Sequence, residues 1–560
     1  MPRKPNAKKP NCFVRADCNK SEREEIQRLV CVGEAKYKDD EESELYCIMH
    51  YRSSSKKVKF DECLQEKLDK KEFDFRFVFF PTLTIENFTF DDVGNFQKAV
   101  FNHTTNFRNV VFNKDANFQD AFFFFYTSFS EVTFNRLAIF ANCNFDGYAF
   151  FSNLTIECKD EKLNPLTSIV IFQFAEFKYD FHWNSICNEI IDFTRTTFEQ
   201  KANFDNSTFL KGFSTFSDAT FKDDASFQNV VFGNDSLKEN CDSFFFTKTV
   251  FGKQVNFQNA IFLLQTNFSK ARFKNFADFR ETLVKTSINF EDATFESYAR
   301  FSSKDNDHKS WNQEGLNFSS IEVEKPERIF FQTVQLRPDS FKNTDIRKFD
   351  FTDIKWKVKN FAWDWSRFKD INWKRKETKA RRTGYVSLEK IYRRFASFAE
   401  ENNDYQSAST FRYTAFDIQR ITPWYGRLPI TLLWWYKWTS RYGENWVWSA
   451  IVLASLVFAF FPYIYTNLNF KTCSKDRPIY TSISICESKI EEINQNCTCS
   501  EERLNFGDAI LQSLTTATLQ NVEYRKPMTW RGELWIILEK IFATLQAALL
   551  ALAIRRKFMR

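Results

Sequence analysis

The chain has 560 residues and a formal net charge of only +6, which excludes a single ordinary domain and a uniformly charged polyelectrolyte. Its mean hydropathy of −0.45 is that of a soluble protein, yet two long apolar runs lie near the C-terminus. Residues 1–10 are basic and no apolar stretch follows them, which argues against a cleaved signal peptide. We therefore expect a soluble N-terminal part, which stays in the compartment where it is made, joined to a membrane part.

Residues 1–70 are polar and charged, and we expect them to form an N-terminal cap. Cys18, Cys31, Cys47 and His50 could bind a zinc ion through three thiolates and one imidazole. The alternative is a small helical cap that contains ordinary reduced cysteines. Either cap would cover the first unit of the repeats that follow, which would otherwise expose an apolar core.

A ladder of phenylalanines fills residues 71–354 and accounts for most of the 69 Phe residues of the chain. Successive Phe residues lie alternately five and six positions apart from Phe96 to Phe151, so the unit is eleven residues, as in NFRNVVFNKDA (106–116). The ladder resumes over 193–209 and 246–301. This spacing fits neither an amphipathic helix nor a single alternating strand. It predicts a solenoid in which each inward side chain is followed by a corner.

Three segments carry a family resemblance: ASFQNVVF (225–232), ANFDNSTF (202–209) and KFDFTDIKW (348–356). They resemble the Phe-rich form of the pentapeptide-repeat family. The resemblance implies a right-handed, four-sided β-helix, and we expect two eleven-residue units in each coil. The breaks in the ladder near 152–190, 233–243 and 302–316 are expected to be insertions that loop out on one side.

The repeats contain no recognisable catalytic arrangement. The four His residues are isolated from one another, and no nucleophile–base pair or glycine-rich phosphate loop is present. We predict that the protein is not an enzyme and that it requires no cofactor apart from the possible zinc. The faces of a rigid solenoid are expected to offer sites for protein partners.

Residues 355–384 form a basic, Trp-rich linker. Eleven Lys or Arg residues face three acidic ones over 355–382, with four Trp interleaved. Nucleic acid could bind such a stretch, but ahead of a membrane domain we favour anionic lipid headgroups. The predicted lipid-binding residues are Lys355, Lys357, Lys359, Arg367, Lys374, Arg375, Lys376, Arg381 and Arg382.

The C-terminal part has the order of a membrane domain. Residues 385–420 predict a helical hairpin broken near 401–404, and residues 421–445 predict an aromatic helix lying on the membrane surface. A first span is predicted over 446–465, and a second span with a basic tail over 535–560. Basic residues flank both spans on one side, so we expect both termini to be cytoplasmic.

The loop 466–505 is then extracytoplasmic. It holds Cys473, Cys486, Cys497 and Cys499, which predict disulfides in an oxidising compartment. The sequon Asn496-Cys497-Thr498 in the same loop agrees with this topology.

Residues 506–534 predict a re-entrant segment, because the apolar stretch inside them is too short to cross a bilayer. DAILQSLTTATL (508–519) resembles the pore helix of two-span tetrameric cation channels. The glycine-containing TVGYG filter of potassium channels is missing after Thr516, so selectivity by that filter is not supported. The pore or filter candidates are Thr515, Thr516, Thr518, Gln520, Asn521, Glu539 and Gln546.

Two alternatives remain open for these candidates. The Thr hydroxyls could serve helix packing by bonding to backbone carbonyls, and Glu539 could form a local pair with Lys540. The favoured interpretation is that the protein is an oligomeric, ion-channel-like membrane protein that passes cations and binds no nucleic acid. We expect the oligomer to be a tetramer. The alternative is a non-conducting scaffold that is anchored by its two spans and binds proteins through the β-helix.

Overall fold

The computed structural model describes residues 37–38, 45–52, 56–157, 169–234, 243–304, 308–311, 315–358, 378–422, 431–475, 497–520 and 525–558. The chain divides into two compact units, Met1–Lys357 and Val358–Arg560.

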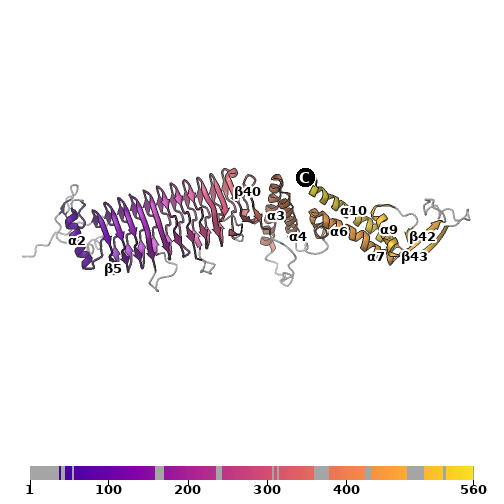
Figure 1. The fold of residues 1–560 in the computed structure, drawn as a ribbon, viewed down its shortest axis with the longest axis horizontal. Helices are drawn as coiled ribbons and strands as arrows, with labels where there is room; N and C mark the ends of the chain where they lie inside the picture. Colours follow the sequence, from indigo (N-terminus) through magenta and orange to yellow (C-terminus); the bar gives the residue numbers. More distant parts are fainter. Residues whose placement is uncertain are drawn as a thin grey trace, which may run out of the picture. The chain divides into compact units, whose positions relative to one another are not determined.

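The first unit is a parallel β-solenoid of about 12 turns, seen as the row of strands in Figure 1. One regular coil contains four short strands, for example β6 (Gly94–Asn95), β7 (Val100–Phe101), β8 (Thr105–Arg108) and β9 (Val111–Phe112). Ala116 pairs with Ala138, a separation of 22 residues, which is two eleven-residue units. The predicted β-helix with two units in each coil is therefore confirmed.

The first two faces are built from short strands. One face consists of β6, β10 (Ala116–Asn117), β14 (Ala138–Ile139), β17 (Val170–Ile171), β20 (Ile191–Asp192), β27 (Ser243–Phe245), β31 (Gln265–Asn267) and β34 (Ile288–Asn289). The next face consists of β3 (Phe79–Phe80), β7, β11 (Phe122–Phe123), β15 (Asn144–Phe145), β18 (Glu176–Phe177), β21 (Thr197–Phe198), β24 (Thr220–Phe221), β28 (Val250–Phe251), β32 (Arg272–Phe273), β35 (Thr294–Phe295) and β37 (Glu322–Val323).

The other two faces are joined into one sheet by long strands that turn the corner between them. The third face consists of β4 (Leu83–Glu86), β8, β12 (Thr127–Ser130), β16 (Ala149–Ile156), β19 (Phe181–Cys187), β22 (Ala202–Asn203), β25 (Ala225–Ser226), β29 (Val255–Asn256), β33 (Ala277–Val284), β36 (Ala299–Ser303), β38 (Ile329–Gln332) and β40 (Asp350–Thr352). The fourth face adds β5 (Thr89–Phe90), β9, β13 (Thr133–Phe134), β23 (Thr208–Phe209), β26 (Val231–Phe232) and β30 (Ile261–Phe262).

Stacked rings fill the interior of the solenoid. The ring of Phe118 lies 4.7 Å from Phe96 in the coil before and 4.8 Å from Phe140 in the coil after, nearly parallel to both. The ring of Phe107 meets Phe118 edge-on across the coil at 5.7 Å. Each position therefore combines complete burial with stacked and edge-to-face contacts, the geometries that aromatic rings prefer.

The corners explain the alternating spacing. In the five-residue step from Phe96 to Phe101, the N–H of Ala99 donates to the carbonyl of Phe96 at 3.0 Å, and Lys98 adopts a left-handed φ of 57°. This is a tight turn with its left-handed residue in the third position. Left-handed residues recur every eleven positions from Asn87 to Asn153. The next step has six residues because its corner lacks such a turn.

One predicted interruption is largely wrong. The segment 152–190 contains the whole of β17, β18 and β19, and Phe172 stacks between Phe140 and Phe193 at 4.9 Å from each ring. The ladder was missed here because Ile156, Trp183 and Cys187 take inward positions in place of Phe. Residues 158–168 and 235–242, within the first and second predicted breaks, lie outside the described residues.

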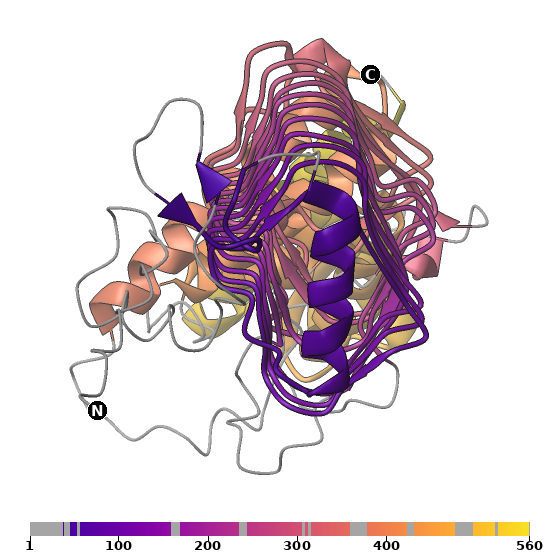
Figure 2. The same cartoon turned by 90° about the vertical axis from the view of Figure 1, so that its left-hand side faces the viewer.

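Helix α2 (Lys57–Asp69) lies across the N-terminal end of the coils, as Figure 2 shows. It buries Phe60, Leu64 and Leu68 on its inward face, and the Phe60 ring meets Phe80 edge-on at 5.5 Å. The short strands β1 (Tyr37–Lys38) and β2 (Leu45–Tyr46) pair antiparallel before it. The first coil is thus shielded from water, as the open end of a solenoid requires.

Short elements end the first unit. They are the 3₁₀ turns His308–Ser310, Pro326–Arg328 and Pro338–Phe341 and the paired strands β39 (Gln335–Leu336) and β41 (Lys355–Trp356). Lys355 and Trp356 therefore belong to the solenoid and not to the predicted linker. The reason is that FDFTDIKW still repeats the coil pattern, with Phe351 stacked on Phe331 at 5.3 Å.

The second unit is helical with one small sheet. Its helices are α3 (Thr378–Glu401), α4 (Tyr405–Ile421), α5 (Leu432–Ser440), α6 (Trp446–Ser455), α7 (Phe461–Thr466), α9 (Phe506–Ala517) and α10 (Trp530–Phe558). A π-helical segment, Leu456–Phe460, joins α6 to α7. The strands β42 (Asn469–Lys475), β43 (Cys497–Arg503) and β44 (Arg525–Pro527) form an antiparallel sheet with β42 in the centre.

Candidate functional site in the C-terminal unit

Helix α9 presents its polar face to the rest of its unit. Ala509, Gln512, Ser513 and Thr516 are buried, whereas the apolar Phe506, Leu511 and Leu514 are exposed. A helix on the surface of a soluble protein has the opposite arrangement, with its apolar stripe against the core. The surroundings of the exposed face must therefore be apolar for this arrangement to be favourable.

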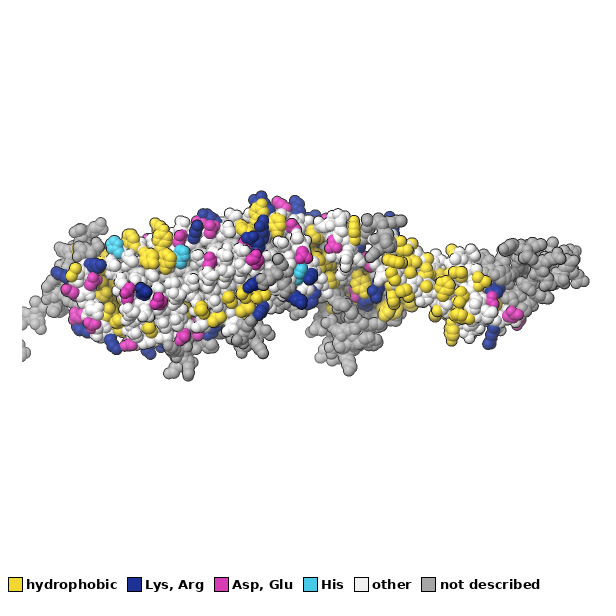
Figure 3. Space-filling model, viewed as in Figure 1, with side chains coloured by type: hydrophobic (Ala, Val, Ile, Leu, Met, Phe, Trp, Pro, Cys, Tyr) yellow, Lys and Arg dark blue, Asp and Glu magenta, His cyan; other side chains and the backbone are white. Residues whose placement is uncertain are grey.

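Helix α10 has the same reversed polarity. Glu539 and Gln546 are 0% and 2% exposed, while Ile537 and Ile541 are more than half exposed. Figure 3 shows apolar side chains gathered on the outside of this unit. Two helical stretches, Trp446–Thr466 and Trp530–Arg556, are long and apolar enough to cross a membrane.

Glu539 is the centre of a buried hydrogen-bonded group. The hydroxyl of Tyr465 in α7 bonds to Oε2 of Glu539, and the hydroxyl of Ser513 in α9 bonds to Oε1. No ion pair of the described residues includes Glu539, so the alternative of a local pair with Lys540 is not the arrangement found here. The pairing fails because Glu539 points into the packed interior, where adjacent residues on a helix face different directions.

The π-helical segment explains why Ser513 is held there. The N–H of Phe461 donates to the carbonyl of Leu456, five residues back. The same pattern would next join residue 462 to Val457, but Pro462 has no N–H. The Val457 carbonyl instead accepts a hydrogen bond from the Ser513 hydroxyl at 2.7 Å. The π-helical segment between α6 and α7 thus leaves a free carbonyl oxygen, which accepts from Ser513 and holds α9 in place.

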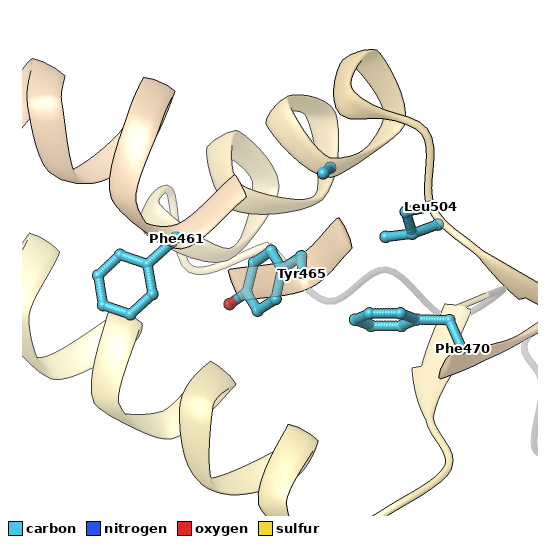
Figure 4. Close-up of a cluster of buried hydrophobic side chains, with 5 residues drawn as sticks. Phe461, Tyr465, Phe470 and Leu504 are labelled. Carbon is cyan, nitrogen blue, oxygen red and sulfur yellow. The ribbon is translucent and has the colours of Figure 1, made fainter. Parts of the chain in front are cut away.

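Apolar side chains surround one side of this group. Phe461, Tyr465, Phe470, Leu504 and Ala509 form a buried cluster. Figure 4 shows the Tyr465 ring between Phe461 and Phe470, with its hydroxyl turned away from Phe470. The phenol is therefore packed by its ring and bonded at its hydroxyl, which fixes its direction.

The Thr hydroxyls bond to the backbone of their own helix. Thr516 Oγ1 lies 2.8 Å from the Gln512 carbonyl, Thr515 Oγ1 lies 2.9 Å from the same carbonyl, and Thr518 Oγ1 lies 3.0 Å from the Leu514 carbonyl. These bonds match the packing alternative for the Thr cluster. They use the hydroxyl hydrogens and leave oxygen lone pairs, so contact between the exposed Thr518 and a cation stays a prediction.

The chain reverses directly after the Thr cluster. The N–H of Gln520 donates to the Thr515 carbonyl, the N–H of Leu519 donates to the Thr516 carbonyl, and Leu519 adopts a left-handed φ of 61°. A left-handed residue at the end of a helix is usually glycine. Here it is an exposed leucine, whose left-handed backbone costs about 1–2 kcal/mol. Gln520 is exposed at this end, and Asn521 lies outside the described residues.

Gln546 connects α10 to the helices before it. Its amide nitrogen donates to the Thr439 carbonyl of α5 at 2.7 Å and to the Ser449 carbonyl of α6 at 3.0 Å. The side chain is buried and ties three helices together. Its geometry is that of a packing residue, and a role in ion contact stays a prediction.

The segment RYGEN (441–445) joins α5 to α6. Arg441, Tyr442 and Gly443 all have positive φ values, so the chain turns sharply here. Glu444 accepts from Arg412 of α4 at 3.0 Å and from Arg556 of α10 at 3.3 Å. This turn therefore attaches the N-terminal end of α6 and the C-terminal end of α10 to α4.

A buried carboxylate completes the junction. Asp417 of α4 lies 2.8 Å from Lys437 Nζ and 3.0 Å from Arg420 Nη2, and it accepts a hydrogen bond from the Tyr442 hydroxyl at 3.0 Å. Burial, and next the charge of Asp417, raise the pKa of Tyr442, so its hydroxyl remains a donor at alkaline pH. This group could not be identified from the sequence, because Lys437 and Tyr442 lie 20 and 25 residues away from Asp417 along the chain.

Two of the loop cysteines stand opposite each other in neighbouring strands. In the antiparallel pair β42–β43, Cys473 stands opposite Cys499 and Lys475 stands opposite Cys497. Residues directly opposed in such strands have Cα atoms about 4.5–5.5 Å apart, a separation that a disulfide can bridge. Cys486 lies outside the described residues.

We predict a Cys473–Cys499 disulfide in protein isolated from its native membrane. Peptide mapping without reduction should recover these two residues in one linked pair, and Cys473→Ser should release a free thiol at Cys499. Cys497→Ser is the matched control, because it should leave the linked pair intact. A bond from Cys473 to Cys486 or Cys497 would contradict the prediction.

Two of the predicted zinc ligands lie side by side in the first unit. The Sγ of Cys47 is 3.1 Å from Nδ1 of His50, and both residues are buried. Cys18 and Cys31 lie outside the described residues. Within the described part of the chain, no group of three or more potential metal ligands is present.

The predicted lipid-binding residues lie mostly outside the described part of the chain. Lys355 and Lys357 are exposed at the end of the solenoid. Arg381 and Arg382 lie in α3, but their side chains are not described. The remaining five candidates, Lys359, Arg367, Lys374, Arg375 and Lys376, fall in 359–377, outside the described residues.

The solenoid carries an exposed aromatic patch that the sequence analysis did not single out. We define it as His103, Phe124, Phe125, Tyr126, Tyr148, Phe150, Tyr179 and His182. The ring of Phe150 lies 4.6 Å from His182, parallel to it, and His103 stacks on Phe125 at 5.1 Å. Figure 3 shows apolar side chains gathered on this face of the solenoid. Exposed patches of this kind often mark interaction sites.

Comparison with known proteins identifies the repeats. The family model described as pentapeptide repeats, with nine copies, matches residues 183–236 and 257–303. A search of curated proteins and a search of solved structures each found no match. The chain thus contains a pentapeptide-repeat domain, folded as a parallel β-helix, followed by two helices that are long and apolar enough to span a membrane.

Proposed function

We propose that the second unit is a membrane domain and that the chain is one subunit of an oligomeric, cation-permeable, channel-like protein. The reversed polarity of α9 and α10 is the observation that carries this proposal. Buried polar residues with exposed Leu, Ile and Phe are favourable when the outside is lipid or a neighbouring subunit. In water the same arrangement would expose apolar surface at a large cost.

The length of α9 supports a re-entrant role. Its twelve residues extend about 18 Å, too short for a bilayer core of about 30 Å. It lies between two helices that are long enough to span, which is the plan of two-span channels. The exposed Leu511 and Leu514 would then contact neighbouring subunits, and a tetramer is our expectation. On this topology both termini are cytoplasmic and the β42–β43 loop is outside.

A flux measurement tests the proposal. Full-length protein in liposomes should pass K⁺ and Na⁺ but not a bulky organic cation. Gln520→Ala should change the ratio of K⁺ to Na⁺ flux, because Gln520 is exposed at the end of α9. Gln406→Ala, which alters an exposed residue of α4, is the matched control and should leave the ratio unchanged. Absence of flux from an intact oligomer would overturn the channel proposal.

The aromatic patch favours a second candidate, the membrane-anchored scaffold. A solenoid that served only as a rigid body would not need exposed, stacked aromatic rings. If the scaffold is correct, replacing 446–556, which holds both candidate spans, with an unrelated two-span anchor should preserve function in cells. A Phe125→Ser and Tyr126→Ser double variant should abolish it. The channel proposal predicts that the anchor replacement abolishes function.

Two further assignments stay proposals. The adjacent, buried Cys47 and His50 support zinc binding in the N-terminal cap, with the other ligands outside the described residues. The basic composition of 355–384 supports binding to anionic lipid headgroups.

A further inference from the structure

The hydrogen bonds around Glu539 require a definite number of protons. Three contacts link five oxygens in a row: the Val457 carbonyl to Ser513 Oγ, Ser513 Oγ to Glu539 Oε1, and Glu539 Oε2 to the Tyr465 hydroxyl. Each contact needs one hydrogen between its two oxygens. Ser513 and Tyr465 supply one hydrogen each, and the Val457 carbonyl supplies none. The third hydrogen must come from the carboxyl group of Glu539.

The direction of each bond follows from Pro462. Because Pro462 has no N–H for the Val457 carbonyl, that carbonyl depends on the Ser513 hydroxyl. Ser513 then cannot also donate to Glu539, and its oxygen must accept. A carboxylate at Glu539 would either face the Ser513 oxygen without a hydrogen or draw the serine hydrogen away. In the second case the buried Val457 carbonyl would lose its donor, which is costly.

Among the residues that the structure describes, no cation is paired with Glu539. Glu539 is fully buried, and no ion pair of the described residues includes it. Among the elements packed against it, α7 contributes Tyr465 and α9 carries Asp508, which is paired with Arg525 at 2.8 Å. The helix α6 and the π-helical segment contain no charged residue, and Lys540 is the adjacent residue on α10. A neutral carboxyl group is therefore the form that this site accommodates.

We propose that Glu539 is a proton-binding site that latches α9 to the two long helices. In the neutral form, Glu539 donates to Ser513, Ser513 donates to the π-helical segment, and Tyr465 donates to Glu539. Loss of the proton breaks one of the three bonds and leaves a charge in the interior. The attachment of α9 then weakens, so proton concentration sets the stability of the helix that precedes Gln520.

Infrared spectroscopy tests the protonation directly. Full-length protein in nanodiscs, with ¹³C-labelled glutamate, should show the carbonyl stretch of a neutral, hydrogen-bonded glutamic acid near neutral pH. Glu539→Gln should remove this band, and the exposed control Glu401→Gln should keep it. A wild-type spectrum with only carboxylate bands near neutral pH would overturn the proposal, and this test does not require any variant to fold.

A stability titration tests the latch. A group that binds its proton more tightly in the folded state stabilises the fold at low pH, and that contribution is lost as the pH rises through its titration. The wild-type unfolding midpoint should therefore fall by at least about 2–4 °C between about pH 5 and pH 9. This pH window ends below the usual pKa of tyrosine, so titration of Tyr465 does not contribute. Glu539→Gln should lose this dependence, because its amide N–H replaces the acid O–H toward Ser513. An equal pH dependence in the wild type and in Glu539→Gln would overturn the latch.

Neither measurement depends on ion flux. The latch can stand if the channel proposal fails, and the channel proposal can stand if Glu539 proves to be ionised.

Discussion

Replacing Phe118 with Ala should destabilise the solenoid by about 3–5 kcal/mol, a large fraction of the stability of an ordinary domain. The ring is completely buried and stacks on Phe96 and Phe140, and it meets Phe107 and Phe129 edge-on at 5.7 and 5.5 Å. Its removal leaves a cavity that two nearly parallel rings cannot close, because the backbone ladder fixes their spacing.

The matched control for this prediction is Phe122→Ala. Phe122 lies in β11, beside the buried Phe123, and points outward with about two-fifths of its surface exposed. Thermal unfolding of the full-length protein, followed by circular dichroism in the β region, should show a large fall in midpoint for Phe118→Ala and a small change for Phe122→Ala. Equal changes in the two variants would contradict the stacked-core account.

Asp417→Asn should cost about 3 kcal/mol in the second unit, because it leaves Lys437 and Arg420 without their shared carboxylate. The Asn side chain keeps the shape of the site and an acceptor for the Tyr442 hydroxyl, so the loss reports the charge. For a unit of about 200 residues this corresponds to a fall of roughly 6–12 °C in the unfolding midpoint.

Glu401→Gln is the control for Asp417→Asn. It also removes one negative charge, but from an exposed position at the end of α3, and should change stability by less than about 0.5 kcal/mol. Unfolding of detergent-solubilised protein, followed by Trp fluorescence, measures both variants, since most Trp residues of the chain lie in the second unit. Similar midpoints for Asp417→Asn and the wild type would show that the junction does not depend on this charge.

Much of the fold could be predicted because most inward positions of the solenoid core are occupied by one residue type, Phe. Phe residues at alternating five- and six-residue intervals give the eleven-residue unit, and the pairing of Ala116 with Ala138 confirms the expectation of two units in each coil. The prediction failed where other side chains take inward positions, as Trp183 and Cys187 do. A rule based on Phe alone cannot recognise them, although their volume and burial serve the same core.

The candidate site was predictable only in part. Glu539 and Gln546 were identified because polar residues inside an apolar run are unusual. Their partners could not be identified, since Ser513 lies 26 residues and Tyr465 lies 74 residues away from Glu539. Tyr465 stands at the end of an apolar run, where an aromatic residue is typical of a membrane interface, whereas the fold turns its hydroxyl inward to Glu539. Such choices depend on helix packing, which a single sequence does not record.

The regular corners of the solenoid have a consequence for how its length can change. The regular coils repeat the same four strands and contact only the coils before and after them, so one regular coil is interchangeable with the next. Removing residues 116–137 would bring Ala138 onto Gly94, the partner that Ala116 has now. The solenoid can therefore be shortened or extended by whole coils, while the cap and the second unit keep their own sequences. Its length is a quantity that selection can adjust in steps of 22 residues without redesigning either end.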